Sequence, residues 1–280
     1  MERTAIPLGG IALNSSVMNA SGPHSAERGE IYELTARHHG AIVFKSCNLA
    51  GLEAPDNLKN RGLEHFATIA RELTPRGKVI VASVVGSTPE EIVEVAAALA
   101  RAGANIVELN LADDYVRNSV APFASLERLN DLLGRARART DVAIAVKVPS
   151  NLALEPRALV ELFSSSRIGI AVCANNPPKD LDLDLKSGVA KGAARSLSQA
   201  YTFYRAGGGA LDIVAVGGIN GGRDAYLAHL MGAKAVQVGS ALIKEGAGAL
   251  GRIDRELDAL LAENNKSSVA EIVGKITFSG

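Results

Sequence analysis

Short apolar runs recur along the chain, and most of them are followed by residues with helical spacing. Eight runs rich in valine, isoleucine and alanine have the length of parallel strands that are buried on both faces. They fall at residues 17–20, 41–45, 78–85, 105–111, 142–147, 168–173, 212–216 and 234–238. Helical patterns follow at residues 123–139, 154–165, 192–206, 223–231 and 247–262. Strict alternation of strand and helix predicts parallel strands joined by right-handed crossovers.

Eight such units favour an α/β fold in which the strands close into a (β/α)8 TIM barrel. An open doubly wound sheet is the rival arrangement, and its first strand normally ends in a dinucleotide-binding glycine fingerprint. Residues 20–23, which follow the first run here, are not such a fingerprint. Apolar residues 4–6 and 11–13 flank Leu8-Gly9-Gly10 and predict a β-hairpin ahead of the barrel. No linker interrupts the pattern, so we expect residues 1–280 to form a single domain.

One helix has both of its ends marked in the sequence. Thr88 is placed to cap it, Pro89 suits its first position, and Glu91 completes a capping box. Gly103 is placed to end it. We therefore expect this helix to connect the third and fourth strands.

Two glycine turns follow the last two predicted strands. Gly217 and Gly218 come after the seventh strand, and Gly239 and Ser240 come after the eighth. Glycine lets the backbone approach a ligand closely and leaves amide N–H groups available at a helix start. In barrel enzymes these two loops commonly bind a phosphate, so the turns predict a phosphate site.

Composition limits the classes of partner. The chain has 280 residues, near the usual length of such a barrel, and 47% of them are hydrophobic. Thirty basic residues balance thirty acidic ones, which supports neither nucleic-acid nor membrane-surface binding. No apolar run is long enough to span a bilayer, and the amino terminus lacks a signal-peptide pattern. Since Cys47 and Cys173 are the only cysteines, we expect a cytoplasmic protein without disulfides.

Polar residues stand near the carboxyl ends of the predicted strands, which in a barrel form the mouth that holds the active site. They are Asn19, Ser21, Lys45, Ser46, Ser83, Glu108, Asn110, Lys147, Asn175, Asn176 and Gln237. Lys45 and Lys147 end otherwise apolar strands, where a lysine is costly to bury without an anionic partner. An ion pair with Glu108, or a side chain that reaches the rim, would satisfy either lysine alone. Two lysines beside asparagines and glycine turns instead favour a ligand site.

Metal-binding patterns are missing from the sequence. His24 and the pair His38-His39 lack ligand spacing to cysteine or acidic residues, so we expect no metal ion. No cysteine-rich cluster is present that could bind an iron–sulfur centre. A lysine over an electron-poor ring could instead stabilise the negative charge that develops when a flavin is reduced.

Eight short motifs lie in order along almost the whole chain. They are Met18–Gly22, Phe44–Ser46, Glu108–Asn110, Val146–Lys147, Asn175, Gly192–Arg195, Val216–Ile219 and Gln237–Ser240. Together they resemble the strand ends of the class 1 dihydroorotate dehydrogenase family, whose members are (β/α)8 barrels that bind FMN. Each motif is short, but their shared order makes the resemblance specific for fold and cofactor.

The resemblance implies particular roles at these positions. By analogy with the family, the residues that bind FMN are Ala20, Ser21, Gly22, Lys45, Ser46, Asn110, Lys147, Asn175, Gly192, Gly217, Gly218, Gly239 and Ser240. The five last-named would hold the ribityl phosphate, and Lys147 would stabilise the reduced flavin near N1. The residues expected to contact the substrate are Lys45, Asn110, Tyr115, Arg117, Asn175 and Asn176.

The chain departs from the family after the fourth strand. Family members carry Ser-Cys-Pro-Asn there, and the cysteine removes a proton while hydride leaves for flavin N5. Here the segment is Leu111–Asn118, which places Asp113 at the cysteine and Tyr115 at a substrate-binding asparagine. The loop after the second strand is also shorter, and the family's Asn-Ser-Met-Gly-Leu is matched only by Lys59–Leu63.

Asp113 is therefore the candidate catalytic base, together with Lys45 and Lys147 as candidate catalytic lysines. A carboxylate has a reference pKa near 4, so it is a weaker base than a thiolate unless burial raises that pKa. The alternative roles of Asp113 are a solvated loop carboxylate or a group that recognises a cationic substrate. Cys47 follows a different strand, and we expect it to be a small buried apolar residue.

The leading hypothesis is an FMN-dependent oxidoreductase that exchanges hydride between flavin N5 and a carbon–carbon bond of a small polar substrate. Dihydroorotate, another dihydropyrimidine or a compound of a specialised pathway would fit. A flavin-free, phosphate-binding lyase or isomerase with a Schiff base on Lys147 is one alternative, and an FMN-binding relative without turnover is another. The oligomeric state stays open, a homodimer included.

Overall fold

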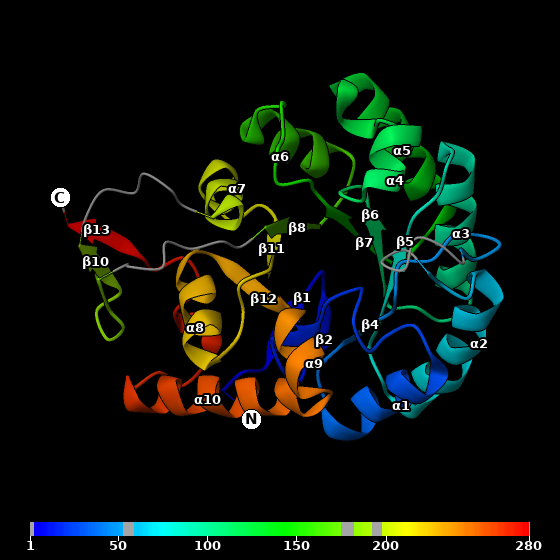
Figure 1. Ribbon diagram of the computed structural model, residues 1–280. Helices are drawn as coiled ribbons and strands as arrows, with labels where there is room; N and C mark the ends of the chain where they lie inside the picture. Colours follow the sequence, from blue (N-terminus) through cyan, green and yellow to red (C-terminus); the bar gives the residue numbers. More distant parts are fainter. Residues whose placement is uncertain (1–2, 53–58, 175–181, 192–197, 280) are drawn as a thin grey trace.

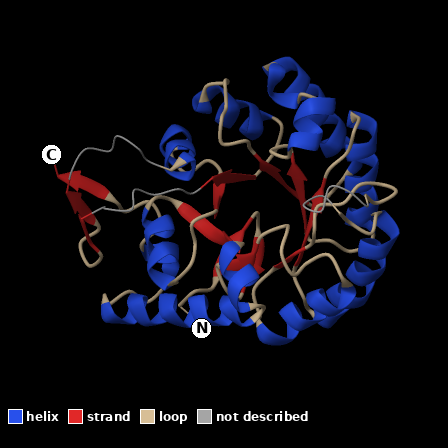
Figure 2. Ribbon diagram, viewed as in Figure 1, coloured by secondary structure: helices blue, strands red, loops and turns tan. Residues whose placement is uncertain are grey.

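Eight parallel strands surround a common axis in the computed structural model, which describes residues 3–52, 59–174, 182–191 and 198–279 (Figures 1 and 2). They are β3 (Val17–Asn19), β4 (Ile42–Val43), β5 (Ile80–Val84), β6 (Ile106–Asn110), β7 (Ala143–Lys147), β8 (Ile170–Ala174), β11 (Asp212–Val216) and β12 (Ala233–Val238). Their order in the sheet is β3-β12-β11-β8-β7-β6-β5-β4. The predicted (β/α)8 barrel is confirmed, with each strand within a few residues of its expected limits.

Helices cover the outside of the barrel, and each lies between two strands in sequence (Figure 2). They are α1 (Arg28–Arg37), α2 (Leu63–Leu73), α3 (Pro89–Arg101), α4 (Asp114–Ser119), α5 (Leu126–Arg139), α6 (Pro156–Ser165), α7 (Gln199–Gly207), α8 (Gly222–Leu230), α9 (Ser240–Glu245) and α10 (Gly248–Glu263). The sequence patterns did not predict α2, α4 or α9. None of the helices in the described residues combines the length and apolarity that crossing a bilayer requires.

One side chain closes the barrel where backbone pairing stops. Among the described strands, β3 and β4 are neighbours that share no ladder. The Asn19 amide donates to the Val43 carbonyl at 2.6 Å, and its oxygen accepts from the Val43 N–H at 2.9 Å. Asn19 is fully buried. Its side chain therefore takes the place of a backbone partner at this seam, by which we mean the β3–β4 contact.

A hairpin closes the other end of the barrel interior. Its strands are β1 (Ile6–Leu8) and β2 (Ile11–Leu13), joined by Gly9 and Gly10, whose φ angles of 57° and 82° are left-handed. Leu8 and Leu13 pack into the apolar cluster inside the barrel. The predicted hairpin is confirmed, but its first strand is Ile6–Leu8 rather than residues 4–6, because the strand runs directly up to the Gly9-Gly10 turn.

The capping of α3 differs from the prediction in one bond. Thr88 caps the helix by accepting from the Glu91 N–H at 3.1 Å, and Pro89 occupies the first turn. The Glu91 carboxylate accepts from Ser87 N–H at 2.8 Å instead of from Thr88 N–H. The capping box is therefore shifted by one residue on its second arm.

A small second sheet stands apart from the barrel (Figure 1). It contains β9 (Asp182–Asp184), β10 (Val189–Lys191) and β13 (Thr277–Ser279), and the sequence patterns predicted none of these strands. The helix expected from residue 192 begins instead at Gln199, where Ser198 accepts from the Tyr201 N–H at 3.3 Å. Residues 192–197 lie outside the described part of the chain.

Candidate functional site

Because side chains alternate between the two faces of each strand, a set of polar residues points into the barrel at the carboxyl ends of the strands. On β6, Ile106 belongs to the interior apolar cluster, so Glu108 and Asn110 lie on the same face at successive levels above it. Asn110 is the register partner of Lys147 on β7, and Glu108 is the partner of Ser83 on β5. The interior therefore changes from apolar at the hairpin end to polar at the mouth.

Glu108 is the centre of this polar group and is fully buried. Its Oε1 accepts a hydrogen bond from the Ser83 hydroxyl at 3.0 Å, and its Oε2 accepts from the Gln237 amide at 2.6 Å. The Lys147 ammonium lies 4.0 Å from Oε1 and donates to the Ser21 hydroxyl at 3.3 Å. The ion pair that the sequence offered as an alternative thus exists for Lys147, and it lies within the candidate ligand site.

A second branch joins Asn110 to the same carboxylate. The Asn110 amide donates to Ser46 Oγ at 2.9 Å, and Ser46 Oγ lies 2.9 Å from Ser83 Oγ. Two buried atoms at the ends of these branches, Asn110 Oδ1 and Gln237 Oε1, have no hydrogen-bond partner among the described residues. Buried polar atoms are nearly always paired, so these two oxygens are acceptors that a ligand with N–H or O–H donors could use.

Lys45 follows β4 and is almost fully buried, with 9% of its surface exposed. Burial lowers the pKa of its ammonium group. The nearby Asp113 carboxylate acts against this lowering, and the Lys147 ammonium adds to it. The predicted catalytic lysines and Asp113 therefore lie close enough to influence each other.

Asp113 is half-buried at the start of α4, where its carboxylate accepts from the Tyr115 N–H at 3.0 Å. Burial raises the pKa of this carboxyl group, and the Tyr115 hydrogen bond opposes the rise. Asp114 adds to the rise, while Lys147 and Lys45 oppose it. Asp113 thus caps a helix and also lies within electrostatic range of two lysines, which combines a structural contact with the setting of a base.

Two further predicted substrate residues lie on α4. Tyr115 is partly buried and packs against the hydrophobic core. The Arg117 guanidinium pairs with the exposed Asp114 carboxylate at 2.9 Å. Their roles toward a substrate remain predictions. So do those of Asn175 and Asn176, and the predicted phosphate contact of Gly192, because these three residues lie outside the described part of the chain.

The end of β3 lies against the turn after β12. The Ala20 N–H donates to the Val238 carbonyl at 2.8 Å, and a Cβ on Gly239 would lie 3.8 Å from the Ala20 side chain. Ser21, which contacts Lys147, follows directly. The residues predicted to line the flavin, at the end of β3, therefore lie next to Gly239, which is predicted to hold the flavin phosphate. Gly22 can contribute only its backbone to this site.

The glycine turn after β11 has the backbone that its residues permit. Gly217 and Gly218 have φ angles of 97° and 72°, which favour glycine. The amino end of α8 beyond them already has acceptors, because Asp224 accepts from Gly221 N–H at 3.0 Å and Glu256 accepts from Gly222 N–H at 2.8 Å. By contrast, no side chain caps α9 after Gly239. A phosphate therefore fits best at the two glycine turns, Gly217-Gly218 and Gly239-Ser240, rather than at the start of α8.

Cys47 is unsuitable as the base. It is fully buried and packs in the cluster between the barrel and its helices. Burial raises the pKa of the Cys47 thiol far above its usual range, which disfavours the reactive thiolate.

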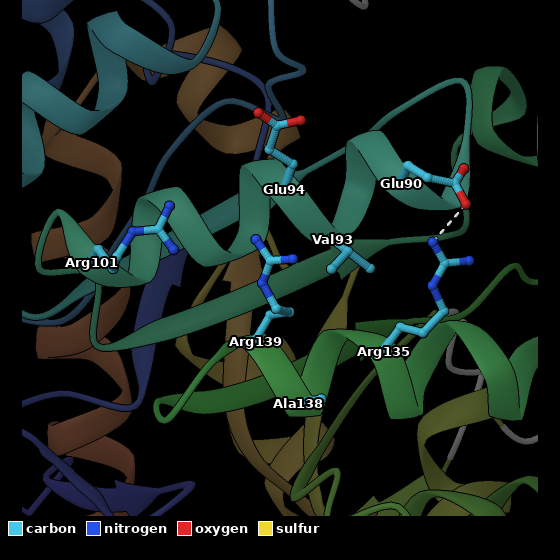
Figure 3. A pocket seen from close by; sticks show the side chains of 7 residues that line it. All are labelled: Glu90, Val93, Glu94, Arg101, Arg135, Ala138 and Arg139. Carbon is cyan, nitrogen blue, oxygen red and sulfur yellow. Dashed lines mark hydrogen bonds and ion pairs between the residues drawn. The ribbon is translucent and has the colours of Figure 1, made fainter.

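Among the cavities formed by the described residues, two bear on the choice of site. One of about 250 Å³ adjoins Lys45 between the loop after β3 and Asn60–Arg61, where Arg61 pairs with Glu27 at 2.8 Å. Another, of about 500 Å³, is a groove between α3 and α5 on the outer face, where Arg135 pairs with Glu90 at 2.6 Å (Figure 3). The outer groove is lined by helix side chains and contains none of the strand-end residues, so the candidate site is the mouth.

Known proteins resemble this chain over nearly its full length. A family model described as dihydroorotate dehydrogenase matches residues 56–261. A putative dihydroorotate dehydrogenase A (fumarate) of Streptococcus equi subsp. equi is 25% identical over 309 residues, which cover 99% of each chain. The catalytic subunit of dihydroorotate dehydrogenase B (NAD(+)) of Thermoplasma volcanium is 24% identical, with 98% of each chain covered.

Solved structures agree in fold. A crystal structure of DHODH from Eimeria tenella in complex with ferulenol aligns with a TM-score of 0.79 at 16% identity, covering 98% of this chain and 88% of that one. At this identity the structural likeness supports only the barrel fold. The family is shown by the family model, which matches well over half of the chain. The chain belongs to the dihydroorotate dehydrogenase family.

Proposed function

We propose that the protein binds FMN at the barrel mouth and exchanges hydride between flavin N5 and a carbon–carbon bond of a small polar substrate. Membership of an oxidoreductase family supports this proposal. The observation that carries it is the buried polar group at the strand ends, where Lys45, Lys147 and Asp113 influence one another. The unpaired buried oxygens of Asn110 and Gln237 also fit a ring that presents N–H groups.

The residues proposed to hold FMN come from both sides of the mouth. Described residues in this set are Ala20, Ser21, Gly22, Lys45, Ser46, Asn110, Lys147, Gly217, Gly218, Gly239 and Ser240. Gly217 and Gly218 have left-handed φ angles at the turn after β11, a conformation in which the backbone can approach a phosphate closely. The adjacent end of β3 would carry the ring, because Ser21 and Lys147 already contact each other there.

FMN, when bound, would supply a hydride acceptor or donor at N5. Oxidation of the substrate breaks two C–H bonds and forms a C=C bond, with the hydride leaving one carbon and a proton leaving the next. We assign that proton to an Asp113 carboxylate oxygen, since burial has already raised the pKa of this group. The Lys147 ammonium would stabilise negative charge on the ring. Lys45 would hold an anionic or carbonyl group of the substrate beside Asp113.

The proposed substrate is dihydroorotate or a related dihydropyrimidine or specialised-pathway compound. The relatives named above are dihydroorotate dehydrogenases, which favours that class. The loop that begins with Asp113 and Tyr115 differs from the family pattern at the base itself. A different substrate within the same chemical class would account for that change.

Anaerobic flavin titration tests the proposal. We expect the purified protein to be yellow, and its flavin absorbance to bleach rapidly on addition of dihydroorotate or another compound of a dihydropyrimidine panel. Protein that neither contains FMN nor takes it up from solution would overturn the proposal. Bound FMN that no compound bleaches would indicate a relative without turnover. Borohydride trapping of a carbonyl compound on Lys147 in colourless protein would identify the lyase alternative.

A further inference from the structure

We propose that Glu108 is a positioning residue that fixes the orientation of two side-chain amides, so that the site binds ring N–H groups. The site of these amides, at the ends of β6 and β12, is the one assigned to FMN and substrate above. The orientation is argued from this chain alone, and only the identity of the N–H group rests on the proposed function.

The first step concerns Gln237. An ionised carboxylate has only acceptors, so every polar group that contacts Glu108 at hydrogen-bond distance must donate to it. Gln237 lies 2.6 Å from Glu108 Oε2, which requires its NH₂ group on that side. Its carbonyl oxygen, Oε1, consequently points away from Glu108 and is the buried oxygen without a partner among the described residues.

The second step follows the other oxygen of Glu108. Ser83 has one hydroxyl proton, and it donates this proton to Glu108 Oε1 at 3.0 Å. Ser83 must therefore accept from Ser46, whose hydroxyl lies 2.9 Å away. Because the single proton of Ser46 is then used, Ser46 accepts from the Asn110 NH₂ group, at 2.9 Å. Asn110 Oδ1 remains as the second unpaired buried oxygen.

These two steps give one polarity to the whole network. Donors point inward to Glu108 along both branches, and acceptors remain at both outer ends. The ion pair with Lys147 offsets the negative charge at the centre. With Glu108→Gln, the neighbours of position 108 would no longer have to donate to it. The NH₂ group of the new side chain could donate to Gln237 or to Ser83, and the hydrogen bonds of that branch could then reverse their direction.

The two acceptors select a particular chemistry. A ring N–H placed between carbonyl groups donates to them, whereas an N-methylated ring cannot. Both the isoalloxazine of FMN and a dihydropyrimidine carry such N–H groups. A bond lost at a buried acceptor should weaken binding about tenfold.

Matched ligand pairs test the polarity. We would measure dissociation constants of FMN and 3-methyl-FMN with apoprotein by fluorescence quenching, and of orotate and its N-methyl derivatives with the FMN-loaded protein. In the unsubstituted protein, one pair should differ about tenfold in favour of the N–H form, and Glu108→Gln should reduce that ratio toward one. The pair that responds identifies cofactor or substrate as the donor. Equal ratios in both proteins for both pairs would overturn the proposal.

Two more variants test whether the change in binding ratio caused by Glu108→Gln is only a structural effect. Glu161→Gln removes an exposed carboxylate on α6 that pairs with Arg157, and it should leave every ratio unchanged. Ser83→Ala cuts only the Asn110 branch and leaves Gln237 held by Glu108. If Asn110 is the acceptor that the ligand uses, Ser83→Ala and Glu108→Gln should be non-additive, because both act through one chain. Ser83→Ala also remains informative if Glu108→Gln does not fold, since a ratio unchanged in Ser83→Ala for both pairs would exclude the Asn110 branch.

A ligand-independent measurement separates this inference from the proposed function. In apoprotein, the side-chain NH₂ signals of Gln237 and Asn110 should exchange slowly with solvent in nitrogen-15 spectra, and Glu108→Gln should speed the exchange. Slow exchange in a protein that binds no FMN would leave the polarity intact and remove the flavin assignment. FMN binding together with rapid exchange of both amides would leave the flavin assignment intact and overturn the proposed polarity.

Discussion

At the scale of single residues, Asp113 has the environment of a base and the position of a helix cap. Its hydrogen bond to the Tyr115 N–H would persist in either role, so geometry alone does not distinguish them. Proton transfer does, because an amide at this position could still accept the capping bond but could not take a proton.

We therefore expect Asp113→Asn to slow flavin reduction by roughly two to four orders of magnitude while FMN stays bound. Rapid-mixing measurements of flavin bleaching under anaerobic conditions would give this rate. Asp131→Asn on α5 is the matched control, since Asp131 is an exposed partner of Arg135. Near-normal reduction by Asp113→Asn would remove the base assignment.

The same assignment predicts a direction for pH dependence. Burial raises the pKa of Asp113, and only its ionised form can accept a proton. The rate of flavin reduction should consequently increase as pH rises through that elevated pKa, then level off. A rate already constant from acidic pH upward would show that Asp113 does not titrate in the reaction.

A different single residue is expected to make a pH-dependent contribution to stability. His229 is fully buried, and burial lowers the pKa of its imidazole to about 4. Its Nδ1 donates to the Ala233 carbonyl at 2.7 Å, so Nε2 accepts from the Ser16 hydroxyl at 3.0 Å. This neutral tautomer joins the end of α8 to the residue just before β3.

Folding should therefore weaken in mild acid. The unfolded chain takes up a proton on this histidine below its ordinary pKa of about 6.5, whereas the folded chain resists protonation until about pH 4. Stability from His229 is complete above pH 6.5 and is lost as pH falls toward 4, by roughly 2 kcal/mol at pH 5. Urea unfolding of the protein and of His229→Gln at pH 5 and 8 would test this. An equal pH dependence in both would contradict it.

At the scale of elements, the seam between β3 and β4 depends on one amide. Replacing Asn19 by leucine, which has a similar size, leaves the Val43 N–H and carbonyl buried without partners at the seam. We expect a loss of about 2–4 kcal/mol in the free energy of unfolding. Urea denaturation measures it. Asn264→Leu, which removes a single bond to Leu260 at the end of α10, should cost much less. Equal costs would show that the seam needs no such bridge.

The sequence predicts the barrel strands and most of the longer helices, although the 11-residue helix α2 was missed. The eight barrel strands are recognisable because each is a run of apolar, β-branched residues that a buried parallel strand requires. The short helices α4 and α9 were missed, since six residues carry too little periodicity. The second sheet was missed because β13 pairs with β10, whose residues lie far away in the chain.

The residues of the candidate site were predictable from the sequence, but the hydrogen bonds between them were not. Lys45, Lys147 and Glu108 stand out because charged residues interrupt apolar strands. That Glu108 bonds to Gln237 depends on the register of distant strands, for 129 positions separate the two residues. Donor direction likewise depends on the complete network and cannot be obtained from strand patterns.

At the scale of the whole molecule, the chain's last described residues connect the second sheet to α7 and α8. β13 pairs with β10, and Ile276 N–H donates to the Leu230 carbonyl at the end of α8 at 3.0 Å. The Phe278 ring meets the Tyr201 ring edge-on, with centroids 6.0 Å apart. β10 ends at Lys191, and Gly192, one of the residues proposed to hold the phosphate, is the next residue in the sequence.

We therefore expect deletion of residues 276–280 to destabilise β9 and β10 together and to weaken FMN retention. Loss of the ring contact and the strand pairing should cost roughly 2 kcal/mol. It should also speed trypsin cleavage at Lys186, which is exposed in the turn between β9 and β10. Thermal unfolding, timed proteolysis and FMN release would be measured together. Phe278→Leu keeps the strand but loses the aromatic pair, so its effects should be intermediate. If the shortened chain kept its unfolding temperature, its resistance at Lys186 and its FMN, the second sheet would have no part in holding the site.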